Sequence, residues 1–206
     1  MKNIKLGLLD LGYRNNKNSL QTLNDIIEYG IRAEELNFSR ICLAEHHNNN
    51  SLHAYNNPEI LLTLIAGNTN KIKVGSAGSL IGYYSPYSLV QNYKLLSNIF
   101  HNRIDFGLSK GKPSHSHLHE YFLIPDKEHI NLFFDNLESI TELFYEEESL
   151  FDKKNIIIPP YGGIYPSLSY LSNSYKDFQI AIEKKLNYCR SLIHGLGRLN
   201  DDFEKE

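Results

Sequence analysis

The sequence predicts an α/β fold built on a parallel sheet of the (β/α) barrel type, and three observations carry this prediction. Short, largely apolar runs of strand length alternate with longer amphipathic segments along most of the chain. Two of the helix candidates begin with a capping residue followed by proline. Polar and titratable residues gather where the apolar runs end. Alternation of this kind indicates parallel strands joined by right-handed crossovers.

The first half of the chain shows this alternation most clearly. Ile4–Leu9 is the first strand candidate, and Ser19 begins a helix to about Leu36, in which leucine and isoleucine recur at helical spacing. After the strand Arg40–Ala44, Asn57 caps a helix with Pro58 at its first position. The remaining elements of this half are a strand over Ile72–Leu80, a helix with Ser85 as cap and Pro86 first, and a strand over Ile104–Leu108.

The pattern loosens after the fourth strand. His115–Lys127 is expected to be a loop, and apolar spacing predicts a helix from about Glu128 to Tyr145. Residues 146–154 are expected to form a solvated charged turn, followed by a short extended piece, Ile156–Ile158, that two prolines end. The last expected elements are a strand at Ser167–Leu171, a helix at Ser174–Lys185 and a strand at Tyr188–Ile193.

An open doubly wound sheet and a barrel both fit this order of elements. No glycine-rich dinucleotide fingerprint follows the first strand, where the chain reads Asp10–Arg14, and this favours the barrel. A complete eight-unit barrel usually takes about 250 residues, with a lower end near 200. Only six strands are expected in these 206 residues. We therefore expect one domain over residues 1–206, a parallel barrel-type fold incomplete at its C-terminus.

Composition excludes several partners. The net charge of −3 gives no electrostatic case for nucleic acid or an anionic membrane. The apolar run at the N-terminus is too short for a signal peptide. Cys42 and Cys189 both fall in predicted buried strands and are expected to be reduced core thiols. These features predict a cytoplasmic protein.

The tripeptide Glu45-His46-His47 follows the second strand, at the end where α/β enzymes usually keep their chemistry. His46 is either catalytic or a hydrogen-bonded structural residue, and His47 is expected to be structural. Glu45 has no assigned chemistry and is expected to bond a neighbouring backbone group or Arg103. No metal site is expected. The alternating His115, His117 and His119 are interpreted as solvated loop residues.

Five segments in register resemble one family, the bacterial luciferase-like flavin-dependent oxidoreductases, or luciferase-like monooxygenases. The resemblance covers residues 1 to about 112 well and 165–195 more loosely. It implies a TIM-type barrel that binds reduced flavin mononucleotide (FMN) at the carboxyl ends of its strands and uses oxygen on an organic substrate; in some members a deazaflavin passes a hydride instead. The five segments are Ala44–Asn48, Asn57–Glu59, Val74–Gly78, Ser85-Pro86 and Arg103–Gly111.

The resemblance also assigns roles to individual residues. The family's active-site histidine falls on His46, and its non-prolyl cis peptide beside the flavin ring falls on Ala77-Gly78. Lys110 stands where an arginine commonly holds the flavin phosphate, and it lacks the arginine fork. The other residues expected to contact the cofactor are Ser109 beside Lys110 and the turn Ser172, Asn173 and Ser174, with Asp177 as an unfavourable charge nearby.

Several functional alternatives stay open. The chain is either a flavin-dependent oxidoreductase, with FMN or a deazaflavin, or a flavin-binding remnant without turnover, or one half of a split enzyme. Because six strands cannot close a barrel of eight-strand geometry, we expect a homodimer or association with a complementary chain.

Overall fold

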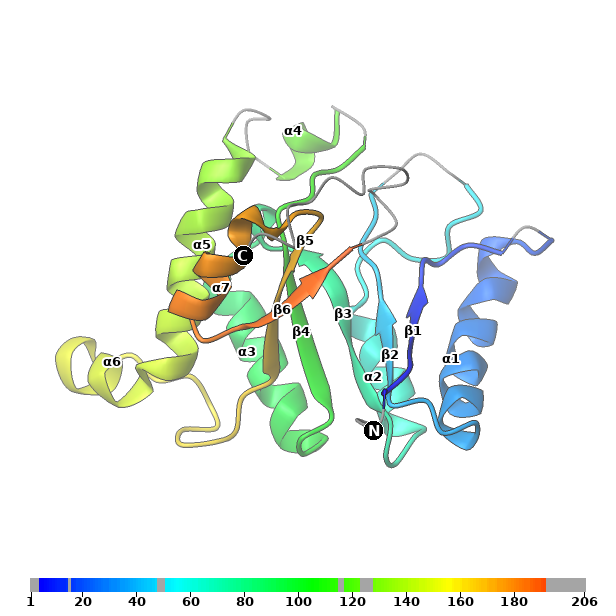
Figure 1. The fold of residues 1–206 in the computed structure, drawn as a ribbon, viewed down its shortest axis with the longest axis horizontal. Helices are drawn as coiled ribbons and strands as arrows, with labels where there is room; N and C mark the ends of the chain where they lie inside the picture. The colour runs from blue at the N-terminus through cyan, green and yellow to red at the C-terminus, as the bar shows by residue number, and fades with distance from the viewer. Residues whose placement is uncertain (1–3, 15, 48–50, 115–116, 123–127, 192–206) are drawn as a thin grey trace.

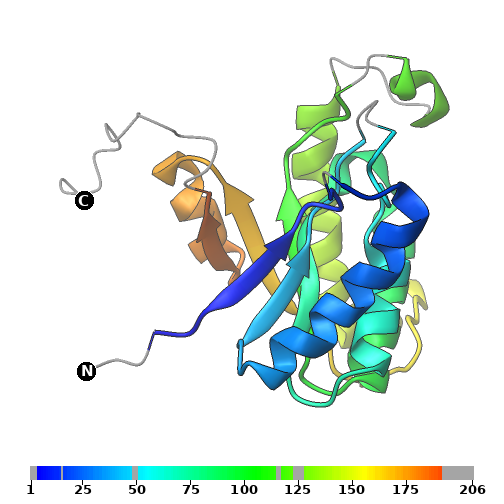
Figure 2. The same ribbon diagram turned by 90° about the vertical axis from the view of Figure 1, so that its right-hand side faces the viewer.

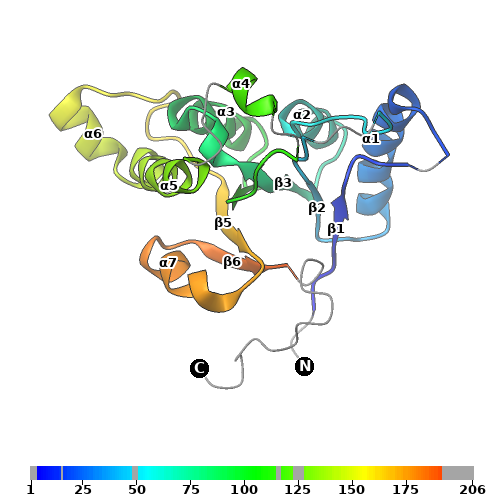
Figure 3. The ribbon, with the colours of Figure 1, turned by 90° about the horizontal axis from the view of Figure 1, so that it is seen from above.

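The computed structural model describes residues 4–14, 16–47, 51–114, 117–122 and 128–191. Its centre is a parallel six-stranded sheet in which each strand pairs with the next along the chain, in the order β1-β2-β3-β4-β5-β6 (Figure 1). The sheet curls into part of a barrel, which confirms the predicted fold class (Figures 2 and 3). The strands are β1 Gly7–Asp10, β2 Arg40–Leu43, β3 Lys73–Leu80, β4 Ile104–Ser109, β5 Ser167–Ser172 and β6 Asn187–Arg190.

The helices lie on the convex side of the curled sheet, as the view from above shows for α1, α2, α3 and α5 (Figure 3). They are α1 Ser19–Glu35, α2 Glu59–Gly67, α3 Pro86–Ile99, α4 Leu118–Phe122, α5 His129–Tyr145, α6 Glu147–Lys154 and α7 Phe178–Glu183. Two 3-10 turns, η1 Ile81–Tyr83 and η2 Tyr175–Asp177, follow β3 and β5. None of the helices in the described ranges is long and apolar enough to cross a membrane.

The hydrophobic core fills the space between the sheet and these helices. Ile41 and Leu43 of β2 are fully buried, whereas Arg40 and Cys42, which alternate with them, are only partly buried. Burial on one face only is expected of a sheet that has helices on its convex side alone. The core is dominated by large side chains, and Phe106 stacks on Tyr93 of α3 at 3.7 Å between ring centroids.

The helix caps lie at the predicted residues or within one residue of them. Ser85 accepts a hydrogen bond from the Ser88 N–H, with Pro86 in the first turn, as expected. The Asn57 side chain accepts from the Glu59 N–H, but Pro58 occupies the cap position of α2. At α1 the cap is Asn18, which accepts from Gln21, and not Ser19.

Two local predictions are wrong. Residues 147–154 form α6, because acidic residues in its first turn and lysines in its last turn match the helix dipole and Leu150 is buried. The expected loop at 115–127 contains the short helix α4.

The cysteines are unpaired, but neither is a core residue as predicted: Cys42 is partly exposed and Cys189 is exposed. Desolvation still raises the pKa of the Cys42 thiol to about 12, and the nearby Asp105 carboxylate adds to this. Leu192 and Ile193, the expected end of the last strand, lie outside the described residues.

Candidate functional site

The parallel strands bring their carboxyl ends to one edge of the sheet, and most of the expected site residues follow these ends. His46 lies three residues beyond β2, Lys110 directly follows β4, and Ser172 is the last residue of β5. The edge therefore carries two groups of polar residues, one beyond β2 and β3 and one beyond β4 and β5.

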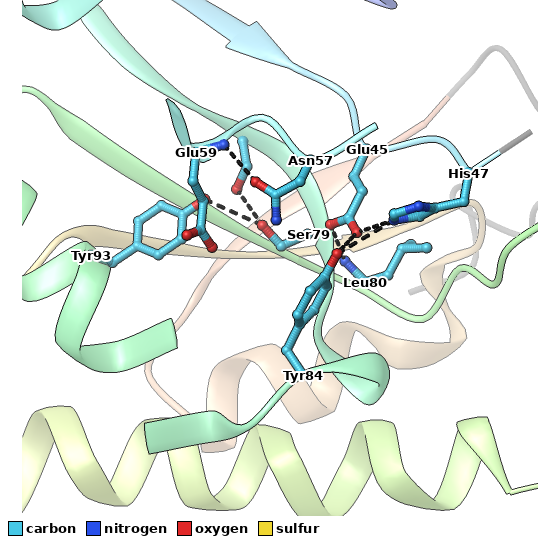
Figure 4. Close-up of polar contacts among 9 residues, drawn as sticks. Glu45, His47, Asn57, Glu59, Ser79, Leu80, Tyr84 and Tyr93 are labelled. Atoms are coloured by element: carbon cyan, nitrogen blue, oxygen red, sulfur yellow. Dashed lines mark hydrogen bonds and ion pairs between the residues drawn. The ribbon is translucent and has the colours of Figure 1, made fainter. Parts of the chain in front are cut away.

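Glu45 is the centre of the first group (Figure 4). Its buried carboxylate accepts the Leu80 N–H at 2.9 Å and the Tyr84 hydroxyl at 2.5 Å, and it lies 2.6 Å from Nε2 of His47. Burial raises the pKa of the Tyr84 phenol, and the Glu45 carboxylate raises it further, so this hydroxyl remains a donor at neutral pH. These contacts join the end of β2 to the end of β3 and to the segment after η1.

The expected bond from Glu45 to a neighbouring backbone group is confirmed, and Arg103 is not its partner. The Arg103 guanidinium instead bonds the Thr69 hydroxyl and the Ala66 carbonyl at the opposite edge of the sheet. His47 is buried, and its ring packs edge-on against Phe122 at 5.1 Å. Burial and packing of this kind fit the structural role expected of His47.

His46, between the buried Glu45 and His47, is exposed. Its ring lies 6.4 Å from that of His53, which in turn lies 5.9 Å from Tyr13. The imidazole of His46 is therefore on the rim of the carboxyl edge, accessible to a ligand and flanked by other rings. Asn48, which follows His47 in the chain, lies outside the described residues, and the Glu45 carboxylate contacts His47.

The peptide bond between Ala77 and Gly78 is cis, at the position that the resemblance implies. A Cβ atom on Gly78 would lie 2.9 Å from the Gly107 carbonyl oxygen of β4 and 3.1 Å from a methyl group of Leu171. Gly78 is thus required by the close approach of neighbouring strands. The β3–β4 register shifts between Ser76 and Ser79, the segment that contains this bond.

The second group contains most of the residues expected to hold a phosphate. The Lys110 ammonium lies 2.5 Å from the Asp177 carboxylate, and the Ser172 hydroxyl donates to the same oxygen at 2.9 Å. Within the turn, the Ser174 N–H donates to Ser172 at 3.3 Å, and the Ser174 hydroxyl accepts the Lys176 N–H. Asn173 is exposed, and Ser109 accepts the Gly111 N–H at 3.2 Å.

These contacts test whether the second group fits a flavin phosphate. The cation and one hydroxyl expected to bind it already contact a carboxylate, and the other hydroxyl caps its own turn. Helix α7, with only six residues, adds little dipole to attract an anion. The structure thus gathers the predicted residues, but their arrangement does not fit a second anion.

Sequence reasoning missed two partnerships in this site. No local motif links Tyr84 to Glu45, which is 39 residues away. Asp177 was recognised as an unfavourable charge, but not as the partner of Lys110, from which it is 67 residues distant. Of the three alternating histidines, His117 is exposed beside Glu120 at 3.9 Å.

Comparison with known proteins identifies the class. Residues 5–156 match the luciferase-like monooxygenase family, and the chain belongs to that family. It is 30% identical over 145 residues to the N-acetyl-S-alkylcysteine monooxygenase of Bacillus subtilis, an alignment that covers 70% of this chain and 43% of that protein.

Solved structures support the same fold. The oxygenating constituent of 3,6-diketocamphane monooxygenase from Pseudomonas putida, in complex with FMN, superposes with a TM-score of 0.73 at 18% identity, covering 90% of this chain and 57% of that one. An F420-dependent secondary alcohol dehydrogenase gives 0.56 at 14% identity, covering 86% and 56%. The chain thus spans about half the length of the proteins it matches.

Proposed function

We propose that this protein is a flavin-dependent oxidoreductase that acts on a small organic substrate, with His46 as its proton-transfer residue. The observation that carries the proposal is the place of His46: exposed, on the carboxyl edge of a family-type sheet, one strand away from Ala77-Gly78. A reduced flavin bound at this edge would supply the electrons for oxygen or for another acceptor.

His46 itself would contribute acid–base chemistry. An imidazole titrates near neutral pH, so it can give a proton to a reacting oxygen or accept one from a hydroxyl group of the substrate. Its exposure allows contact with a ligand, which the burial of His47 does not. Ala77, Gly78 and Ser109 are proposed to lie along the flavin.

FMN is the cofactor that the comparisons favour, because the FMN-bound neighbour superposes better than the F420-dependent one, with TM-scores of 0.73 and 0.56. Binding of a flavin without turnover is the second candidate. It is favoured by the sheet itself, since the described strands number six and the usual closed barrel has eight.

Replacing His46 tests the proposal. His46→Ala should still bind flavin but lose turnover by about 10²–10⁴-fold, the usual effect of removing a general acid or base. His101, an exposed histidine at the opposite edge of the sheet, provides the matched control, and His101→Ala should keep the rate. Binding is measured by flavin fluorescence, and turnover with reduced FMN and oxygen or with a reduced deazaflavin and an acceptor.

The outcomes separate the candidates. Equal turnover of His46→Ala and the parent protein would refute the role of His46. A parent protein that binds flavin but shows no turnover with either reductant would support the binding protein without activity. His47→Ala should lower stability more than rate, because His47 is buried against Phe122 and Glu45.

A further inference from the structure

Asp177 occupies the place where the expected phosphate site has its donors. One carboxylate oxygen contacts both the Lys110 ammonium at 2.5 Å and the Ser172 hydroxyl at 2.9 Å. The Asp177 side chain is only 17% exposed and that of Lys110 32%. An ion pair that is this short and largely shielded from water leaves little of the lysine charge for another anion.

Helix capping does not explain the orientation of the Asp177 side chain. Asp177 stands at the cap position of α7, where an aspartate usually accepts hydrogen bonds from the first turn. Its side chain makes no such bond and turns to Lys110 instead. The Lys110 ammonium is in turn held 5.9 Å from the ring centres of both Phe134 and Tyr170.

The charge balance of the site follows from these contacts. Lys110 and Asp177 cancel, so a flavin phosphate would bring negative charge to a neutral pair and would have to displace the carboxylate. Two further cations belong to this edge: Lys176 on η2, and Arg190, which is paired with Ser172 between β5 and β6 and lies over the Tyr175 ring. A flavin that lacks the phosphate meets no such penalty.

We propose that Asp177 determines cofactor specificity, by occupying the phosphate position and removing the advantage that FMN would otherwise have over unphosphorylated riboflavin. This inference rests on the proposed function, since it assumes that a flavin binds at the carboxyl edge. It concerns the ribityl end of the flavin and leaves the role of His46 unchanged.

Titration with the two flavins tests the proposal. The parent protein should bind oxidised FMN and riboflavin with similar Kd values. Asp177→Asn should tighten FMN by about 10-fold or more and leave riboflavin unchanged, because it removes one unit charge beside the phosphate. Glu183→Gln removes the same charge from the far end of α7 and should change neither Kd. Asp177→Ser also removes the charge and retains a residue type that caps helices, so it should affect the two Kd values in the same direction as Asp177→Asn.

Lys110→Ala completes the series. With the lysine removed, the Asp177 carboxylate is no longer neutralised, so FMN should weaken much more than riboflavin. Equal losses for the two flavins would place the phosphate elsewhere and overturn the proposal.

The remaining outcomes are also decisive. If Asp177→Asn and Asp177→Ser weaken FMN, Asp177 holds Lys110 in position for the phosphate, and the proposal is wrong. An unchanged ratio of the two Kd values in both variants overturns it as well. Binding of FMN only after Asp177 is replaced supports it. If neither flavin binds to the parent or to any variant, the proposed function fails, and this inference fails with it.

Discussion

At the scale of single residues, Glu45 shows how a buried carboxyl group is supplied with hydrogen-bond partners. Its donors come from β3 and from the segment after η1, and the imidazole of His47 lies against it. A buried carboxylate without such partners would be strongly destabilising, whereas hydrogen bonds to a charged group contribute about 1.5–3 kcal/mol each. The cluster therefore fixes the end of β2 beneath the exposed His46.

Tyr84→Phe should lower the free energy of unfolding by about 1.5–3 kcal/mol, because it removes the hydroxyl that donates to Glu45 at 2.5 Å. Tyr87→Phe is the control. The Tyr87 side chain is exposed and its hydroxyl makes only a 3.4 Å bond, so its loss should stay within about 0.5 kcal/mol. Urea denaturation measures both variants, and equal effects would remove the special role of Tyr84.

At the scale of elements, the end of α1 is joined to the start of β3 by Glu34. Its carboxylate accepts the N–H groups of Asn70, Lys71 and Ile72 at 3.0, 2.5 and 2.8 Å. Partial burial opposes the charged form of Glu34, but these three bonds and the nearby charge of Arg103 together outweigh it and lower its pKa below the ordinary value of 4.5. The folded protein thus holds this proton less tightly than the unfolded chain does.

The lowered pKa of Glu34 predicts the direction of a pH effect. Its contribution to stability is present above pH 4.5 and is lost as the pH falls through the lower pKa of the folded state. Glu34→Gln should therefore be less stable than the parent at neutral pH and approach it at acidic pH. Glu35→Gln, which changes an exposed neighbour, should leave the pH profile unaltered. The free energy of unfolding is measured by denaturation at several pH values between neutral and acidic. If the stability of both variants changed with pH as that of the parent does, the assignment to Glu34 would be contradicted.

The elements also show what the sequence could predict. All six strands and the capped helix α3 follow from local patterns, because apolar spacing and N-terminal caps act within a few residues. Helix α6 was missed because its polar sequence shows little apolar periodicity, and only Leu150 is buried. The position of the cis peptide at Ala77-Gly78 came from the family resemblance. The pairing of Lys110 with Asp177 could not be predicted, because only the fold brings β4 and η2 together.

At the scale of the whole molecule, the curled sheet has two open sides in the part of the chain that the structure describes. There β1 pairs only with β2, and β6 only with β5. Apolar side chains lie exposed along and just before β1: Ile4 is 88% exposed, Leu6 64% and Leu9 44%. Unpaired strand edges with apolar neighbours are templates for pairing with another chain.

We therefore predict that the purified protein self-associates through its open edge, since another copy of the same chain is the partner present in solution. Light scattering over a range of concentrations should give a mass above that of one chain. Leu6→Lys should weaken the association, because a lysine at a strand edge opposes pairing. Ile60→Lys is the matched control: Ile60 is 77% exposed on α2, away from the edge, and the variant should associate like the parent. Loss of association in Ile60→Lys alone would move the contact to the helical face, and a stable monomer at all concentrations would show that the edge does not pair.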